Sequence, residues 1–182
     1  MTRTLIGALA ALLFILGMGA ARAGQATRLS FAEQVFAIDT IYTDASRSSI
    51  LEDKLLPVIP QFNALSERAE DTIDDCIAFL SETSHTEQQR RIAILAMQKL
   101  SLRGYVRFAD AVLDLNEKGL ASRNDVIEAV MPSHSHVYVD NFLNPDVRQI
   151  LYRTRDIPNM YPEIKDSLFY TLIGLDYVRS LL

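Results

Sequence analysis

The stretch Thr86-Glu-Gln-Gln-Arg-Arg-Ile-Ala-Ile-Leu-Ala-Met-Gln-Lys-Leu100 decides the fold of this chain. Its start, Thr86 followed three residues later by Gln89, has the pattern of a capping box, in which two side chains satisfy free amides at a helix N-terminus. The six residues from Ile92 to Met97 are all apolar, so a helix over 86–100 has no polar side in its middle. Such a helix is buried by neighbours on several sides. The stretch therefore predicts the central helix of an all-α domain.

Helix-start and helix-stop patterns continue outward from this segment in both directions. The second half of the chain adds an Asn144-Pro-Asp start and a Pro162-Glu start, whereas no alternating apolar run of useful length predicts a strand. In the last expected helix, Leu168 and Leu172 belong to one apolar stripe that Phe169 and Ile173 widen. Gly174 interrupts this helix at a cost of about 1 kcal/mol relative to Ala, which suggests that another helix crosses closely there. We expect a compact bundle of six to eight helices with short connections capped by Pro, Ser and Asn. Helices are expected over residues 31–43, 50–58, 62–81, 86–100, 104–116, 123–131, 145–155 and 162–182.

Residues 1–23 have the pattern of a secretory signal peptide. Arg3 is followed by an uncharged apolar run from residue 5 to 20, and Ala21-Arg-Ala23 is a small-x-small cleavage site. The alternative is an uncleaved membrane anchor, but the run is slightly short for a span and contains glycines. We expect cleavage after Ala23, leaving residues 24–182 as one all-α domain without a stable membrane span. The expected location is the periplasm or the medium.

The charge balance restricts the kind of partner. The chain has 18 basic and 23 acidic residues, and the expected signal peptide removes two arginines and no acid, which deepens the formal charge from −5 to −7. Nucleic acids and anionic membranes require clustered positive charge, so neither is an expected partner. An acidic surface favours a basic protein partner instead.

Cys76 is the only cysteine and cannot form an internal disulfide. It lies three residues after Ile73 and four before Leu80, and this helical spacing places it on a predicted buried stripe. Because reactive thiols need exposure and a positive environment, Cys76 is predicted to be a core residue.

The segment Ser133-His-Ser-His-Val-Tyr-Val-Asp140 is the one candidate for metal chemistry. In an extended chain His134 and His136 project to the same side, and Asp140 adds an oxygen ligand. The alternative is a solvated loop that contains two imidazoles. No Gly-x-Ser-x-Gly or His-Glu-x-x-His motif occurs, and the acids of residues 67–75 fit the solvated face of a helix. We expect no cofactor and no catalysis, with a metal-dependent hydrolase left as the open exception.

Aromatic residues and arginines gather in the second half of the chain, and these types dominate binding hot spots. The candidate partner-binding residues are Tyr138, Asp140, Phe142, Tyr152, Arg153, Arg155 and Tyr161. The first functional hypothesis is an exported helical protein that acts by binding another protein, as an inhibitor, an adaptor or an immunity-type protein. The alternative is a periplasmic helical bundle that binds a metal or small ligand through residues 133–140. The sequence does not specify the oligomeric state.

Overall fold

The computed structural model describes residues 29–46, 59–131 and 144–180. Within these ranges it contains eight α-helices, two short 3-10 helices and no strand, which confirms the all-α prediction for this part of the chain. The chain divides into Met1–Ser30 and Phe31–Leu182, and every described helix belongs to the second unit. The expected signal peptide and the expected helix at 50–58 lie outside the described residues. The α-helices are α2 (Phe31–Ser46), α3 (Pro60–Ser66), α4 (Ile73–Ser81), α5 (Glu87–Leu95), α6 (Leu102–Glu117), α7 (Arg123–Val130), α9 (Pro145–Arg155) and α10 (Pro162–Ser180).

Helix α5 and the short 3-10 helix η4 (Ala96–Lys99) occupy the centre that the sequence predicts for residues 86–100. Thr86 caps α5 through a complete capping box with Gln89, and both reciprocal bonds are present. All but one of the six apolar residues in the middle of the stretch are buried, Leu95 being half-buried. Helix α5 packs against α2, α4 and α7, so neighbours surround it as expected.

The prediction of one continuous helix over 62–81 is wrong. The structure divides it into α3, a 3-10 helix η3 (Ala69–Thr72) and α4. At the break, the buried Thr72 hydroxyl donates to the carbonyl oxygens of Arg68 at 3.1 Å and of Ala69 at 3.4 Å. Side-chain bonds of this kind compete with the regular backbone ladder of a helix. The apolar spacing in the sequence persists through the break, which is why periodicity alone does not reveal it.

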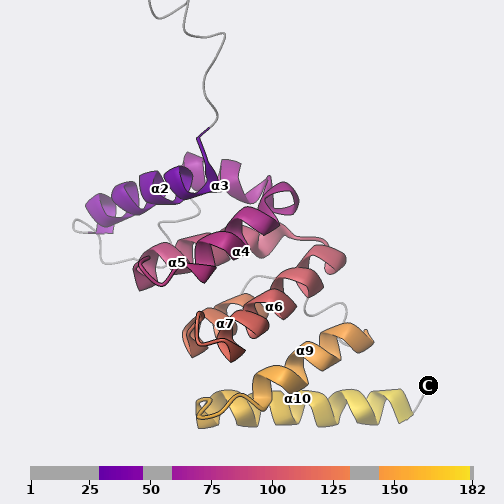
Figure 1. Cartoon of the computed structure of the whole chain (residues 1–182). Helices are drawn as coiled ribbons and strands as arrows, with labels where there is room; N and C mark the ends of the chain where they lie inside the picture. Colours follow the sequence, from indigo (N-terminus) through magenta and orange to yellow (C-terminus); the bar gives the residue numbers. More distant parts are fainter. Residues whose placement is uncertain (1–28, 47–58, 132–143, 181–182) are drawn as a thin grey trace, which may run out of the picture. The chain divides into compact units, whose positions relative to one another are not determined.

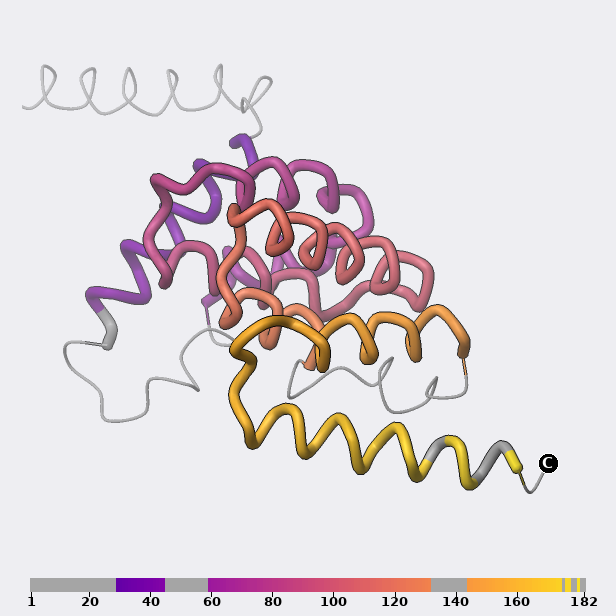
Figure 2. Tube along the Cα trace, turned by 60° about the horizontal axis from the view of Figure 1, so that its bottom comes forward, coloured from indigo at the N-terminus to yellow at the C-terminus, as the bar shows by residue number. Residues whose placement is uncertain are grey.

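The helices of Phe31–Leu182 follow one another in layers (Figures 1 and 2). Helix α2 contacts α3, α4 and α5; α4 packs on α6, and α5 packs on α7. Helices α6 and α7 then both contact α9, and α9 packs on α10. Both views show α10 on the far side of α9 from α6, so it forms the last layer. Within the described residues, no helix is long and apolar enough to cross a bilayer.

Helix α10 departs from its prediction in two ways. Leu168 and Leu172 are buried as expected, but Phe169 and Ile173, which the pattern adds to the same buried stripe, are exposed. The close helix crossing expected at Gly174 is not found among the described residues, because a Cβ built there meets none of them within 4 Å. The reason is that, among the described helices, α10 packs mainly on α9, which covers one narrow stripe and leaves Phe169 and Ile173 exposed.

Candidate binding site along helix α9

Helix α9 begins where the sequence predicts. The side-chain oxygen of Asn144 accepts bonds from the amides of Asp146 at 2.8 Å and Val147 at 3.3 Å, and Pro145 occupies the first turn. This cap fixes the helix start and hence the direction in which each side chain points. One side of α9 buries apolar residues in the core, whereas arginines and a tyrosine extend from the other side.

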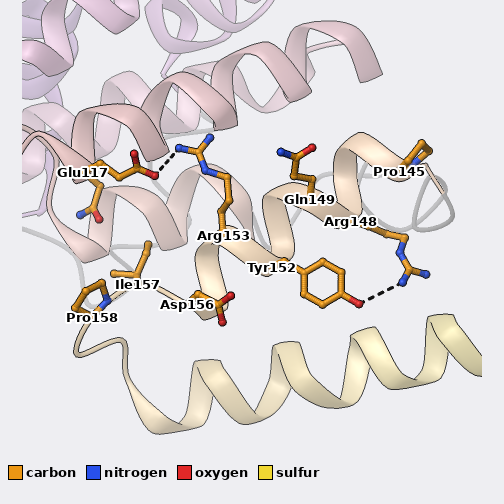
Figure 3. Close-up of a pocket in the computed structure, with 10 residues that line it drawn as sticks. Glu117, Pro145, Arg148, Gln149, Tyr152, Arg153, Asp156, Ile157 and Pro158 are labelled. Atoms are coloured by element: carbon orange, nitrogen blue, oxygen red, sulfur yellow. Dashed lines mark hydrogen bonds and ion pairs between the residues drawn. The ribbon is translucent and has the colours of Figure 1, made fainter.

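A hollow of about 940 Å³ lies along this second side of α9 (Figure 3). Half of its lining residues are exposed, so it opens onto the surface instead of forming an enclosed cavity. Its volume falls in the range of ligand sites in proteins. The hollow is lined by Asn116, Glu117, Pro145, Arg148, Gln149, Tyr152, Arg153, Asp156, Ile157 and Pro158.

Arg153 connects α9 to α6 inside the hollow. Its guanidinium pairs with three carboxylates of α6: Asp110, Asp114 at 2.7 Å and Glu117 at 2.7 Å. These acids are spaced by four and three residues, so they lie on one face of α6. Burial alone lowers the pKa of Arg153, but hydrogen bonds with Glu117 and Asp114 outweigh it and raise this pKa overall. Arg153 is therefore a fixed cation that neutralises one of three neighbouring negative charges.

Arg148 connects α9 to the last layer. One of its terminal nitrogens, Nη2, bonds to Asp176 of α10 and to the hydroxyl of Tyr152 at 3.3 Å. The other, Nη1, is buried and has no hydrogen-bond partner among the described residues. The Tyr152 ring also lies 5.1 Å from the guanidinium carbon of Arg155, within cation–π distance. Tyr152 is thus held between two arginines.

The charges around the hollow are unequal in number and in exposure. Three arginines belong to it or border it, and all three are half-buried. Five carboxylates pair with these arginines, and all five are exposed. The arrangement leaves two negative charges in excess and places the carboxylates on the outside. The arginines are Arg148, Arg153 and Arg155, and the acids are Asp110, Asp114, Glu117, Asp156 and Asp176.

The structure brings together some of the predicted partner-binding residues. Tyr152 and Arg153 line the hollow, and Arg155 lies beside it, bonded to Asp156 at 2.8 Å. Tyr161 lies apart, against α7, where its hydroxyl bonds to Asn124 at 3.2 Å and its ring contacts the Arg123 guanidinium at 4.8 Å. The other candidates, Tyr138, Asp140 and Phe142 together with the predicted metal ligands His134 and His136, lie outside the described residues.

The acidic side of the site is what the sequence prediction missed. Glu117, Gln149 and Asp156 line the hollow but are absent from the predicted set. A signal for them exists: Asp110, Asp114 and Glu117 form one acidic row, and Arg148 and Tyr152 are separated by four residues on α9. The two helices meet only through tertiary packing, which spacing within either helix does not reveal.

The other described side chains considered for metal binding or nucleophilic chemistry do not lie at this site. Among the described residues, no group of three or more His, Cys, Asp or Glu side chains could hold a metal ion. Cys76 is buried and its thiol donates to the carbonyl oxygen of Ala93 at 3.5 Å. Burial raises the pKa of this thiol strongly, and the nearby Arg90 offsets the rise only in part. The interpretation of Cys76 as a core residue fits its burial.

Comparison with known proteins gives no relative from which a role could be transferred. Protein families, curated proteins and solved structures were all compared with the chain, and none of them matches it.

Proposed function

We propose that the protein is a non-catalytic binding protein that holds a segment of another protein in the hollow along α9. The observation that carries this proposal is the open hollow with Tyr152 between two arginines. Tyrosine and arginine are among the residue types that most often dominate protein interfaces. A small-molecule site commonly encloses most of its ligand, whereas half of the residues here are exposed. An extended chain segment suits that openness better.

The partner segment is basic. The five carboxylates around the hollow are exposed and outnumber the three arginines, so an approaching cationic chain meets negative charge first. Such complementarity speeds encounter and excludes acidic competitors. With the export signal expected at residues 1–23, this encounter takes place in the periplasm or outside the cell. An inhibitor, an adaptor or an immunity-type protein would all act in this way.

The test places a photo-crosslinking amino acid at Gln149, which is exposed and lines the hollow, in the producing cells. The matched control carries the same group at Gln61, an exposed residue of α3. We expect one protein to be captured from Gln149 and not from Gln61. The purified partner should bind the wild-type protein, with an affinity that falls as salt rises.

The site is then blocked with Gln149→Trp, and Gln61→Trp is the control. Because both residues are exposed, neither change should unfold the protein, which circular dichroism verifies. The proposal requires that Gln149→Trp weakens binding at least about tenfold while Gln61→Trp leaves it unchanged. Identical adducts from both positions, or equal affinity of the two variants, would overturn it.

A further inference from the structure

The outward side of α10 carries four large apolar residues although it belongs to the last layer of the described helices. Phe169, Tyr170, Ile173 and Tyr177 are 49%, 73%, 50% and 66% exposed. Their spacing places them on neighbouring positions of one helical surface, opposite the buried Leu168 and Leu172. Water-exposed helix surfaces normally carry polar residues, so an outward stripe of this kind indicates an interface. We call these four residues with Gly174 the α10 face.

Gly174 lies within the α10 face, one turn from both Tyr170 and Tyr177. Glycine inside a helix is about 1 kcal/mol less favourable than alanine. Nothing within 4 Å of a Cβ at this position explains the glycine, and its φ is not positive. A missing side chain does allow the backbone of another helix to approach closely. No described helix of this chain makes such an approach, which leaves the position open to the helix of another molecule.

The α10 face supplies a large part of the area that an interface between two copies needs. At about 200 Å² for a whole aromatic side chain, the three rings alone expose roughly 400 Å². That is about half of what each partner contributes to a standard interface of about 800 Å² per side, before Ile173 and the flanking residues are added. The five residues of the face carry no charge, so two copies of this acidic protein can meet there without opposing carboxylates.

We propose that the protein forms a symmetric dimer in which α10 packs antiparallel against the α10 of a second copy. A two-fold axis between Ile173 and Gly174 places each Ile173 over the glycine of the partner subunit. The same axis places Tyr170 against the partner subunit's Tyr177, so the face is complementary to itself. Closed two-fold pairing of one patch with its copy is the commonest form of protein oligomer. The dimer does not use the hollow along α9, and its test is independent of the function proposed for that hollow.

Sedimentation velocity of the purified protein, from about 1 to 100 µM, measures the association directly. We expect a monomer–dimer equilibrium that Tyr170→Asp shifts toward monomer by at least about tenfold in dissociation constant. Gly174→Leu should weaken the dimer too, although leucine is the better helix former, because its side chain blocks the close approach. Ile41→Asp is the control: Ile41 is an exposed apolar residue of α2, and its replacement should leave the equilibrium unchanged.

Disulfide trapping gives a second readout that does not depend on destabilising the interface. The two-fold axis also passes beside residue 173, so Ile173→Cys brings two thiols together without filling the space at Gly174, and mild oxidation should yield a covalent dimer. Ser84→Cys, an exposed position between α4 and α5, should not. The native Cys76 is buried and does not compete. A monomer throughout the concentration range overturns the proposal, even if some other protein covers α10. The proposal is also overturned if Tyr170→Asp leaves the dissociation constant of the dimer unchanged, or if both cysteine variants are trapped equally.

Discussion

Arg90 holds one carboxylate oxygen of Asp125, Oδ2, through two nitrogens, Nε at 3.1 Å and Nη2 at 3.0 Å, and both side chains are buried. The same guanidinium donates to the carbonyl oxygens of Leu80 at 2.8 Å and Leu120 at 3.0 Å. Asp125 Oδ2 also accepts from the amide of Ser122, completing the capping box of α7. One arginine therefore ties together the end of α4, helix α5 and the start of α7.

Arg90→Ala should destabilise the protein by about 3 to 5 kcal/mol, because it leaves the Asp125 carboxylate buried without its partner. Chemical denaturation measures the loss. The next residue is a matched control, since Arg91 is exposed and pairs with Glu128 on the surface. Arg91→Ala should cost no more than about 1 kcal/mol. Comparable losses from the two variants would contradict the role assigned to the buried pair.

Local patterns in the sequence predict the structure correctly where residues close in the chain control it. The caps at Thr86 and Asn144 are each formed by residues next to the helix they begin, so their types and spacing suffice to predict them. The buried stripe containing Cys76 likewise depends on helical spacing alone.

Prediction failed where neighbours decide the outcome. Phe169 and Ile173 are exposed because α9 is the main neighbour of α10 among the described helices, and no pattern inside α10 reports how many helices surround it. For the same reason, the sequence predicts only some of the residues that line the hollow. Tyr152 and Arg153 stand out by residue type, whereas Glu117 becomes part of the site only because α6 packs on α9.

Gly104→Ala should lower the free energy of unfolding by about 1 kcal/mol because the new methyl group clashes with Glu70. Removing the Glu70 side chain should abolish this cost. The Glu70 carboxylate bonds to the amide of Ser101 at the start of α6, and a Cβ on residue 104 would lie 2.6 Å from its Oε2 atom. The new methyl group must displace this carboxylate and break its bond. In a Glu70→Ala background the same change should be neutral or stabilising, since alanine favours helix.

Gly119→Ala is the comparison for this double-mutant cycle. Gly119 has a φ of 73°, so alanine is strained there whatever its surroundings. Its cost should be the same with and without Glu70. If the cost of Gly104→Ala were equally independent of Glu70, the steric explanation would be wrong.

Cys76 should not react with a thiol reagent at about pH 8 until the protein unfolds, because the thiolate is the reacting form and burial raises the thiol pKa. The raised pKa also makes a prediction for stability. Unfolding lets the thiol lose its proton once the pH exceeds the ordinary thiol pKa, so wild-type stability should fall at alkaline pH relative to Cys76→Ala. Rapid labelling of the folded protein would contradict both expectations.

The metal hypothesis for residues 133–140 makes a separate prediction. If His134 and His136 bind zinc with Asp140, calorimetric titration should show binding at micromolar concentration or tighter. The double variant His134→Ala/His136→Ala should lose it. His85→Ala is the control, since the His85 ring is stacked on the Phe79 ring, with 3.7 Å between the ring centroids. Equal binding by the double variant, or none by the wild type, would reject this site.

Arg153→Gln should lower stability by about 1 kcal/mol, since Asp110, Asp114 and Glu117 are then left facing one another without a cation. The loss should shrink as salt is raised from about 0.05 to 0.5 M, because salt screens repulsion between exposed charges. Arg155→Gln is the control: this arginine pairs with its sequence neighbour Asp156 and connects no helices, so little change is expected.

The same variant separates stability from binding. Arg153→Gln makes the hollow more negative, so a basic partner should associate faster with it at low salt although the protein is less stable. Stopped-flow association with the captured partner measures this rate. A salt-independent stability loss would reject the electrostatic account of Arg153, and slower association would reject the expectation of a basic partner.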